Sequence, residues 1–243
     1  MSKIVWDQKG KHYWEAGVKF GVLYPMKDDG TYDKGVAWDG LTSISMNPDG
    51  ADPNELWADN IKYAVLRSAE TLSLTIEAYQ YPPEFEPCDG LGVVEGASGL
   101  VVGQQERQSF GLCYRTEVGN DTNAKADDSY KLHLIYGCTA QPSDKDYETI
   151  NDSPDAMTFS WEVDTLPENV EGTTMLPVSE IVVDSRRADA EKLAVLEGYL
   201  YGKDAQEAHG SVGDDDYTPA IEASEPTLLT PAQVIKILKD GTL

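Results

Sequence analysis

The chain has 243 residues, of which 43 are acidic and 19 are Lys or Arg, so its formal net charge is −24. This length favours one large domain, with or without an appendage, and 40% apolar residues are enough for a substantial core. No apolar run approaches the roughly 18–20 residues that span a bilayer, and so acidic a chain repels phosphate backbones and anionic lipids, which argues against ordinary membrane and nucleic-acid binding but allows a protein that touches DNA without binding it.

Most of the chain alternates apolar and polar residues with a period of two, the pattern of half-buried strands. Weaker strands are expected at 18–24, 41–46, 61–67, 110–118 and 176–183, and clearer ones at 71–79, 130–138 and 157–164. Clean alternation predicts antiparallel sheets with one buried side and one solvated or partner-facing side. We therefore expect a mainly β fold of two packed antiparallel sheets, a sandwich or a barrel.

Two of the clear strands have a polar side that nothing in the sequence requires to be buried. In 71–79 the apolar residues, such as Leu74 and Ile76, share one side of the strand. The same alternation holds in 157–164, where Trp161 points inward. The polar side chains that face away from the core are Ser73, Thr75 and Glu77 in the first strand and Thr158, Ser160 and Glu162 in the second.

One α-helix flanking the sheets is expected at 189–201. Asp189 is a suitable N-cap, and Gly202 stands where a helix-ending glycine belongs. Leu193, Leu196 and Leu200 repeat at helical spacing and form one apolar stripe that should lie on a sheet.

The composition changes after Gly202, so we divide the chain into a β domain, 1–202, and an acidic linker with a C-terminal arm, 203–243. In the arm, Thr230 and Pro231 begin a short helix. The arm is too apolar to remain in water, so it must dock either on its own sheet or on a neighbouring subunit, and we favour the neighbour. The residues expected to make this contact are Leu228, Leu229, Ile235 and Leu238.

The sequence contains few residue patterns that are typical of catalytic sites. The three cysteines Cys88, Cys113 and Cys138 are too widely spaced for a zinc site and indicate two core thiols and one loop thiol in a reducing compartment. No phosphate-binding loop or nucleophile-elbow motif is present, and His133 is expected to be a surface histidine on its strand. We therefore expect no enzyme activity, no catalytic residue, no cofactor and no metal.

Several strings in the sequence carry a resemblance to a known family. They include Lys-Ile-Val-Trp-Asp-Gln at 3–8, Gly-Val-Leu-Tyr-Pro at 21–25, Phe-Gly-Leu-Cys-Tyr-Arg-Thr at 110–116 and Tyr-Lys-Leu-His-Leu-Ile-Tyr-Gly-Cys at 130–138. The chain resembles, from residue 3 to about 202, the major tail proteins of long-tailed, non-contractile bacteriophages. The sequence after residue 202 differs from that family, apart from a weak similarity at 226–238.

The resemblance implies a tail-tube fold of two packed antiparallel sheets with a helix at the flank. It implies hexameric rings that stack into a tube, enclose the tape measure protein and conduct DNA during ejection. The other implied partners are the tail terminator and distal tail proteins, and the implied location is the virion tail, assembled in the cytoplasm of the bacterial host. The six polar residues named above are candidates for the lining of the lumen, where acidic side chains would let DNA pass without binding.

The segment 47–59 is expected to be a long loop that contacts a neighbouring subunit. It carries Leu56 and Trp57, two apolar side chains that a free loop would expose. The resemblance supports this role, because the tubes of that family use a long loop between early strands for such contacts. The alternative is that Trp57 folds back onto its own core.

Two other classes of function remain open at this stage. One is a monomeric β-sandwich binding module for a surface carbohydrate or a protein ligand, with Trp38 and Trp57 exposed on loops to stack on the ligand. The other is a hydrolase that uses an unrecognised pair of acids. The size of the native protein separates these classes, because a tube subunit forms rings or rods and the others are monomers.

Overall fold

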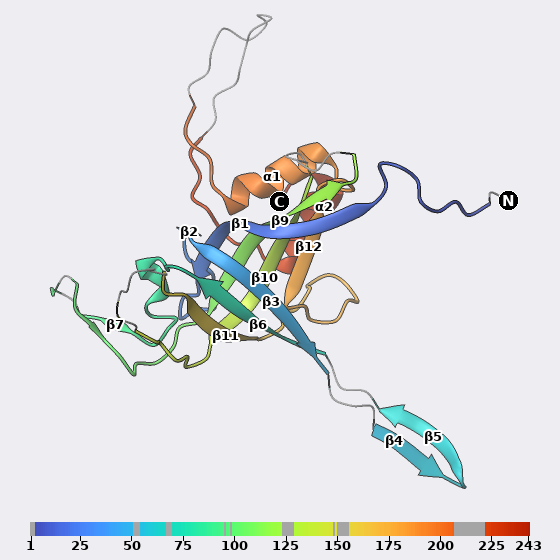
Figure 1. The fold of residues 1–243 in the computed structure, drawn as a ribbon, viewed down its shortest axis with the longest axis horizontal. Helices are drawn as coiled ribbons and strands as arrows, with labels where there is room; N and C mark the ends of the chain where they lie inside the picture. Colours follow the sequence, from blue (N-terminus) through green and yellow to red (C-terminus); the bar gives the residue numbers. More distant parts are fainter. Residues whose placement is uncertain are drawn as a thin grey trace, which may run out of the picture.

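The computed structural model describes residues 3–243 apart from 51–53, 67–69, 95, 98, 123–128, 148, 150–155 and 207–221. Its main strands are β1 (Tyr13–Pro25), β2 (Val36–Trp38), β3 (Leu41–Asp49), β6 (Thr71–Ala78), β9 (Phe110–Asn120), β10 (Tyr130–Ala140), β11 (Phe159–Thr165) and β12 (Glu180–Asp184). They form one antiparallel sheet of eight strands in the order β2-β1-β9-β10-β11-β6-β3, with β12 beside β10 (Figure 1). The mainly β fold is confirmed.

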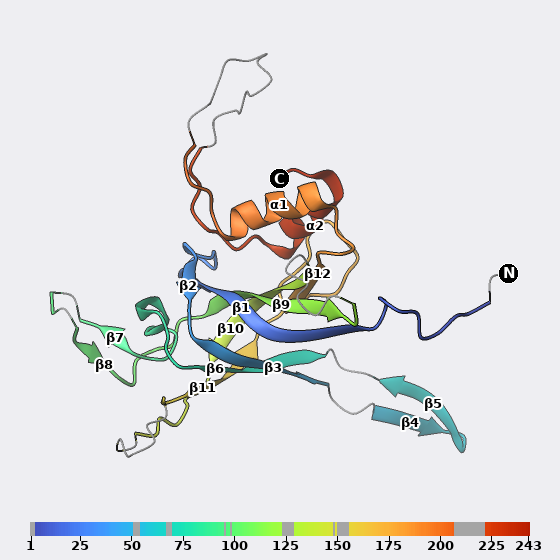
Figure 2. The same ribbon diagram turned by 45° about the horizontal axis from the view of Figure 1, so that its top comes forward.

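Smaller elements stand outside this sheet. The strands β4 (Asn54–Ala58) and β5 (Ile61–Leu66) form one antiparallel pair, and β7 (Gly92–Val93) and β8 (Val101–Val102) form another. A short 3-10 helix, η1 (Pro83–Phe85), follows β6. Both small pairs lie at the periphery of the molecule, on opposite sides of the main sheet (Figures 1 and 2).

The main sheet folds over on itself where β10 meets β11, because these two strands pair only through residues 138–140 and 163–165. One half, with β1, β9 and β10, therefore lies over the other half, with β3, β6 and β11 (Figure 2). The core between them buries Leu23, Ile76, Phe110, Ile135 and Trp161. The two packed sheets expected from the sequence are thus two halves of one continuous sheet. Within the described residues β2 and β3 end the sheet, so no barrel closes.

Two helices, α1 (Ala190–Leu200) and α2 (Pro231–Asp240), cover the outer face of the β1–β9–β10 half (Figure 2). The carboxylate of Asp189 caps α1 by accepting hydrogen bonds from the backbone N–H groups of Glu191 (3.0 Å) and Lys192 (3.3 Å). Gly202 follows the helix with φ +77°, a conformation that costs glycine little. The flanking helix and its buried leucine stripe are confirmed, since Leu193, Leu196 and Leu200 are all buried.

The C-terminal arm docks on its own chain, which corrects the preference for a neighbouring subunit. Leu228 and Leu229 are only 4% exposed and pack in the core between the helices and the sheet, while Ile235 and Leu238 are partly buried. Two backbone hydrogen bonds hold the segment in place. The Gly35 N–H donates to the Pro226 carbonyl (2.9 Å), and the Thr227 N–H donates to the Tyr199 carbonyl (2.8 Å).

The physical reason for docking within the chain lies at the two ends of the linker. Lys203 and Ser224 pair with each other as an isolated β-bridge, with N···O distances of 3.0 and 2.9 Å. The chain therefore resumes beside the place where it left α1, and the nearest apolar surface is its own. Most of the expected linker, residues 207–221, lies outside the described residues.

All three cysteines are free and buried. Cys113 lies in β9 and Cys138 in β10, as the sequence predicts, and Cys88 follows η1. Burial raises the pKa of the Cys88 and Cys113 thiols to about 12, so both stay protonated at neutral pH and are poor nucleophiles.

Candidate functional site

The outer face of the β3–β6–β11 half is a continuous polar surface. The strand registers bring polar side chains into three rows across it, because directly opposite residues on neighbouring strands point to the same side. The rows of this surface, which we name the polar face, are Ser43–Glu77–Ser160, Ser45–Thr75–Glu162 and Asn47–Ser73–Asp164. Between them Leu74, Ile76, Trp161 and Val163 turn inward and are buried.

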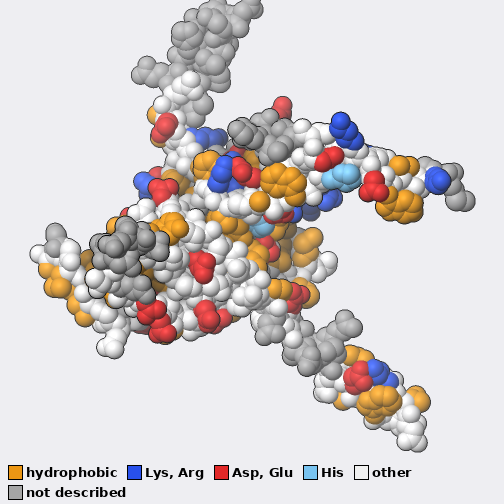
Figure 3. Space-filling view, viewed as in Figure 1, with side chains coloured by type: hydrophobic (Ala, Val, Ile, Leu, Met, Phe, Trp, Pro, Cys, Tyr) orange, Lys and Arg blue, Asp and Glu red, His pale blue; other side chains and the backbone are white. Residues whose placement is uncertain are grey.

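The chemistry of the polar face is hydroxyl groups, an amide and carboxylates, and no row contains Lys or Arg. The Ser43 hydroxyl donates to Glu77 Oε2 at 2.7 Å, and the Ser73 hydroxyl donates to the Asn47 carbonyl at 3.1 Å. In Figure 3 the surface over these strands is white and red, without blue. Such a surface holds water well and repels phosphate.

The structure brings together most of the polar residues that the sequence placed on two separate strands. Ser73, Thr75, Glu77, Ser160 and Glu162 are immediate neighbours, because β6 pairs with β11. Thr158 is exposed just before β11 and stands outside the rows. The third strand of the surface, β3, adds Ser43, Ser45 and Asn47. A strand was expected at 41–46, but its polar residues were not among the candidates, although the alternation of 41–47 carried the signal.

The segment 47–59 is not the plain loop that we expected. Its second half is strand β4, which pairs with β5 to form a β-hairpin that projects from the body (Figures 1 and 2). The turn between the strands is Asp59–Asn60, with φ of +52° and +62°. Positive φ at both central residues is the signature of a tight hairpin turn, and Asp and Asn accept it readily.

Most of the apolar side chains of this hairpin are exposed, as the orange atoms over it in Figure 3 show. The exposed fractions are 63% for Trp57, 61% for Ile61 and 72% for Tyr63. Leu56, at 40% exposed, lies on the side opposite Trp57. The alternative that Trp57 folds back on its own core is therefore wrong. An isolated two-stranded hairpin is marginally stable in water, so this one needs a surface to pack against.

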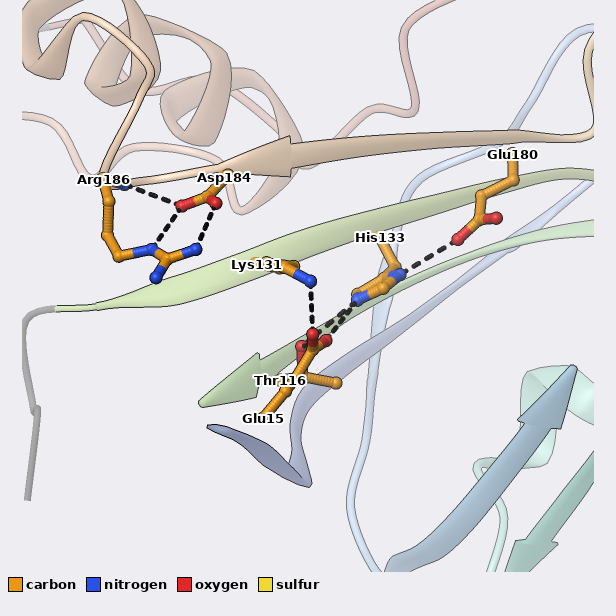
Figure 4. Close-up of polar contacts among 7 residues, drawn as sticks. All are labelled: Glu15, Thr116, Lys131, His133, Glu180, Asp184 and Arg186. Carbon is orange, nitrogen blue, oxygen red and sulfur yellow. Dashed lines mark hydrogen bonds and ion pairs between the residues drawn. The ribbon is translucent and has the colours of Figure 1, made fainter. Parts of the chain in front are cut away.

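A network of charged side chains occupies the inner face of the β1–β9–β10 half (Figure 4), where three of its members, Glu15, Thr116 and His133, line a crevice together with residues 42–44 and 46 of β3. His133 lies between two carboxylates, with Nδ1 3.0 Å from Glu180 Oε1 and Nε2 3.5 Å from Glu15 Oε1. Its ring stacks on Tyr114 with centroids 4.7 Å apart. His133 is only 9% exposed, so the expected surface histidine is wrong: Leu132 and Leu134 face the helices, which turns His133 inward.

The remaining members of the network are also paired. Lys131 bonds Glu15, and Arg186 bonds Asp184 through two nitrogens at 2.6 and 2.9 Å. Burial raises the pKa of Glu15, but hydrogen bonds from Lys131 and Thr116 outweigh it, so the pKa is below its usual value. The contacts of Glu15 with Lys131 and of His133 with Glu180 join β1, β10 and β12. In the part of the chain that the structure describes, no three His, Cys, Asp or Glu residues are arranged to hold a metal ion.

Trp38 is not available to stack on a ligand. It is 2% exposed, its ring lies 4.6 Å from Phe85 and 5.8 Å from Trp161, and its Nε1–H donates to the Gln80 carbonyl at 2.9 Å. Of the two tryptophans that the binding-module hypothesis uses, only Trp57 remains exposed.

Comparison with known proteins finds little. No protein-family model matches the chain, and no curated protein matches it significantly. Among solved structures, the chain is similar to one in the cryo-EM structure of the anti-feeding prophage baseplate, 6-fold symmetrised, with a TM-score of 0.34 and 9% identity over 76% of this chain and 99% of that one. So low a similarity carries no conclusion about function. None of the described helices is both long enough and apolar enough for a membrane span.

Proposed function

We propose that this chain is the tail tube subunit of a long-tailed, non-contractile bacteriophage, a structural protein without enzyme activity. In this proposal six copies form a ring, rings stack into a tube in the virion tail, and the tube encloses the tape measure protein and conducts DNA. The tail terminator and distal tail proteins are its partners at the two ends, and assembly takes place in the host cytoplasm. The resemblance of the strings between residues 3 and 202 supports the family.

The observation that carries the proposal is the polar face. Serine, threonine and asparagine with Glu77, Glu162 and Asp164 form a wet, acidic surface without a basic residue, which suits a channel through which DNA slides. The helices cover the opposite side of the molecule (Figure 2). With the polar face turned to the lumen, α1 and α2 lie on the outside of the tube.

The strand edges beside the polar face support ring closure. In the described residues, β3 pairs with β6 on one side and has no strand on the other, and β11 meets β10 only through 163–165. The edges at the two ends of the β3–β6–β11 half differ from each other. A contact in which the free edge of β3 receives a different part of the next copy is therefore head-to-tail, the type of contact that closes rings.

The β4–β5 hairpin supports contacts between subunits or rings. It carries exposed apolar side chains away from the body and has too little structure of its own to be stable alone. In the proposed tube, Leu56 and Trp57 pack on a neighbouring copy. This role replaces the one first expected for Leu228 and Leu229, which are buried in their own chain.

Negative-stain imaging of the purified full-length protein tests the proposal, with light scattering across salt and protein concentration. Each copy carries −24, and the Debye length shortens from about 8 Å at 0.15 M salt to about 3 Å at 1 M, so repulsion between copies weakens as salt rises. We expect rings or tubes, favoured by salt. A strict monomer under every condition would contradict the proposal and favour the binding module.

A further inference from the structure

A crevice opens between β1 and β3, at the place where the folded sheet fails to close. It has a volume of about 470 Å³. Its apolar lining is continuous with the core, because Val18, Ile44 and Met46 pack against the core cluster and Tyr114 belongs to it. Its polar lining is Glu15, Thr42, Ser43, Thr116 and His133, so the charged network borders the crevice.

Both walls of the crevice are strand edges that lack a neighbour among the described residues. On one wall, β2 pairs with β1 only at residues 21–23, which leaves residues 13–20 without a strand on that side. On the other wall, the edge of β3 opposite β6 is free. A Cβ atom added to Gly17 of β1 would have no other atom within 4 Å, so the β1 wall of the crevice faces open space at this residue. Free edges over an apolar floor are the setting in which an extended segment adds as a strand.

The N-terminal segment, residues 3–8, has the properties of such a strand over residues 3–6, and its backbone leaves the extended conformation at Asp7, where φ is +55°. It contains no helix or turn, and Ile4, Val5 and Trp6 are 68%, 63% and 73% exposed. In an extended segment Ile4 and Trp6 point to one side and form an apolar edge. The segment leaves the sheet and runs away from the body (Figures 1 and 2).

Charge favours another copy of this chain as the receptor. The segment itself is neutral, with Lys3 against Asp7, and the adjoining residues add Lys9 and Lys11, whereas the whole chain carries −24. This end of the chain is therefore attracted to a copy that otherwise repels its neighbours. A strand of four residues, 3–6, buries little area and binds weakly alone. In a ring, where every copy donates and receives one segment, the contacts reinforce one another.

We propose that the crevice between β1 and β3 receives the N-terminal segment of a second copy. The segment adds along the free edge of β3, with Ile4 and Trp6 on the crevice floor. The proposal rests on the proposed function, because it requires that copies assemble, and it names a donor and a receptor for that assembly.

Disulfide trapping between two full-length variants tests the proposal. Val5→Cys places a thiol on the segment, and Thr42→Cys places one on an exposed crevice residue. The native cysteines are buried and do not compete. After mixing and mild oxidation we expect a covalent dimer whose linked peptide joins positions 5 and 42. The matched control mixes Val5→Cys with Asp28→Cys, an exposed position outside the crevice, and should yield many-fold less.

Imaging the same mixtures separates the failure of this proposal from the failure of the proposed function. Tubes without a link above the control would overturn the crevice as receptor and leave the tube intact. A link formed within one chain carrying both cysteines, under dilution to monomer, would overturn the second copy as donor. Neither tubes nor links would overturn both proposals.

A second pair of variants avoids cysteine chemistry. Because Ile4 and Trp6 are exposed in the single chain, replacing both by Ser should leave the melting temperature of the monomer unchanged. Assembly should be lost, whereas Val5→Ser, on the other side of the segment, should have a smaller effect. Equal assembly by both variants would contradict the proposed orientation.

Discussion

At the residue scale, the Asp121 carboxylate, together with Asn120, whose side-chain amide donates to the Gly10 carbonyl at 3.2 Å, fixes the direction in which the N-terminal segment leaves the sheet. Asp121 accepts hydrogen bonds from the backbone N–H groups of Gly10 (2.9 and 3.1 Å to its two oxygens) and His12 (3.3 Å). The bond from Gly10 is the main cause that holds the pKa of Asp121 below its usual value. Because the folded-state pKa is depressed, this stabilisation is fully present above an ordinary aspartate pKa of about 3.9 and is lost as pH falls through the folded value.

Asp121→Ala should therefore release the root of the segment without unfolding the protein. We expect trypsin to cleave after Lys9 and Lys11 several-fold faster, with little change in melting temperature, because these residues contribute nothing to the core. Asp28→Ala, at an exposed carboxylate on another turn, is the control. In the native protein, hydrogen-exchange protection of the Gly10 amide should fall on acidification below the Asp121 pKa. Unchanged cleavage in Asp121→Ala would show that the carboxylate does not hold the segment.

At the element scale, the C-terminal arm should act as part of the fold. Burying Leu228, Leu229, Val234 and Ile237 stabilises by about 1.5–3 kcal/mol each before entropy is subtracted. Truncation after Gly202 should then cost at least about 4 kcal/mol, which for a chain of this size lowers the melting temperature by about 8–16 °C. Calorimetry or thermal melting followed by circular dichroism measures this change in melting temperature.

The linker supplies a matched control for that truncation. Because Lys203 and Ser224 pair directly, the residues between Asp204 and Ala223 can be replaced by a two-residue turn that keeps the arm attached. This shortened chain should melt within a few degrees of the native protein. If truncation leaves stability unchanged but abolishes assembly, the arm acts on a neighbour and docking within the chain is wrong.

The β4–β5 hairpin should be needed for assembly and dispensable for folding. Trp57 is exposed in the monomer, and within the described part of the chain its ring has one cation–π partner, Lys62 of the same hairpin, whose Nζ lies 5.9 Å from the ring centroid. Trp57→Ala should therefore leave the melting temperature nearly unchanged and prevent stacking into tubes, as seen by negative stain. Leu243→Ala, at another exposed apolar side chain, should assemble normally. Normal tubes from a stable Trp57→Ala protein would show that the hairpin is not the contact.

The elements that the sequence predicted well are those whose secondary structure is determined by residues within the element or next to it. Alternation placed β6 and β11 to within two residues at each end, and Asp189 with Gly202 placed α1. The hairpin strand β4 was missed because the adjacent apolar residues Leu56 and Trp57 break its alternation, and its turn has Asp-Asn in place of the stronger Asn-Gly signal.

Features set by distant contacts could not be predicted. The burial of Trp38 depends on Phe85 and Trp161, and that of His133 on Tyr114 and Glu180, all far apart in the sequence. The same holds for the polar face, because its rows exist only once β3, β6 and β11 lie side by side in register.

At the scale of the whole molecule, polar and helical surfaces lie on opposite sides of the folded sheet (Figure 2). The acidic side chains of the chain therefore have two different surroundings in the proposed tube. Carboxylates on the polar face line the lumen, and carboxylates near the helices face the exterior. A duplex that passes such a lining finds no cation to exchange for its counterions, which is the source of most non-specific affinity. The tube can thus conduct DNA without holding it.

The last prediction tests this sliding surface by charge reversal. The native protein should not bind duplex DNA measurably at physiological salt, as followed by fluorescence anisotropy. Glu77→Lys with Glu162→Lys places two cations on the polar face, and tubes of this variant should retain DNA with an affinity that falls steeply with salt. Glu191→Lys with Asp240→Lys changes the net charge by the same amount on the helical side, where both residues are exposed, and should retain far less. Equal retention of DNA by both variants would mean that the polar face does not line the path of the DNA. Salt-sensitive binding of duplex DNA by the native protein below micromolar concentrations would contradict the idea that DNA passes the polar face without binding.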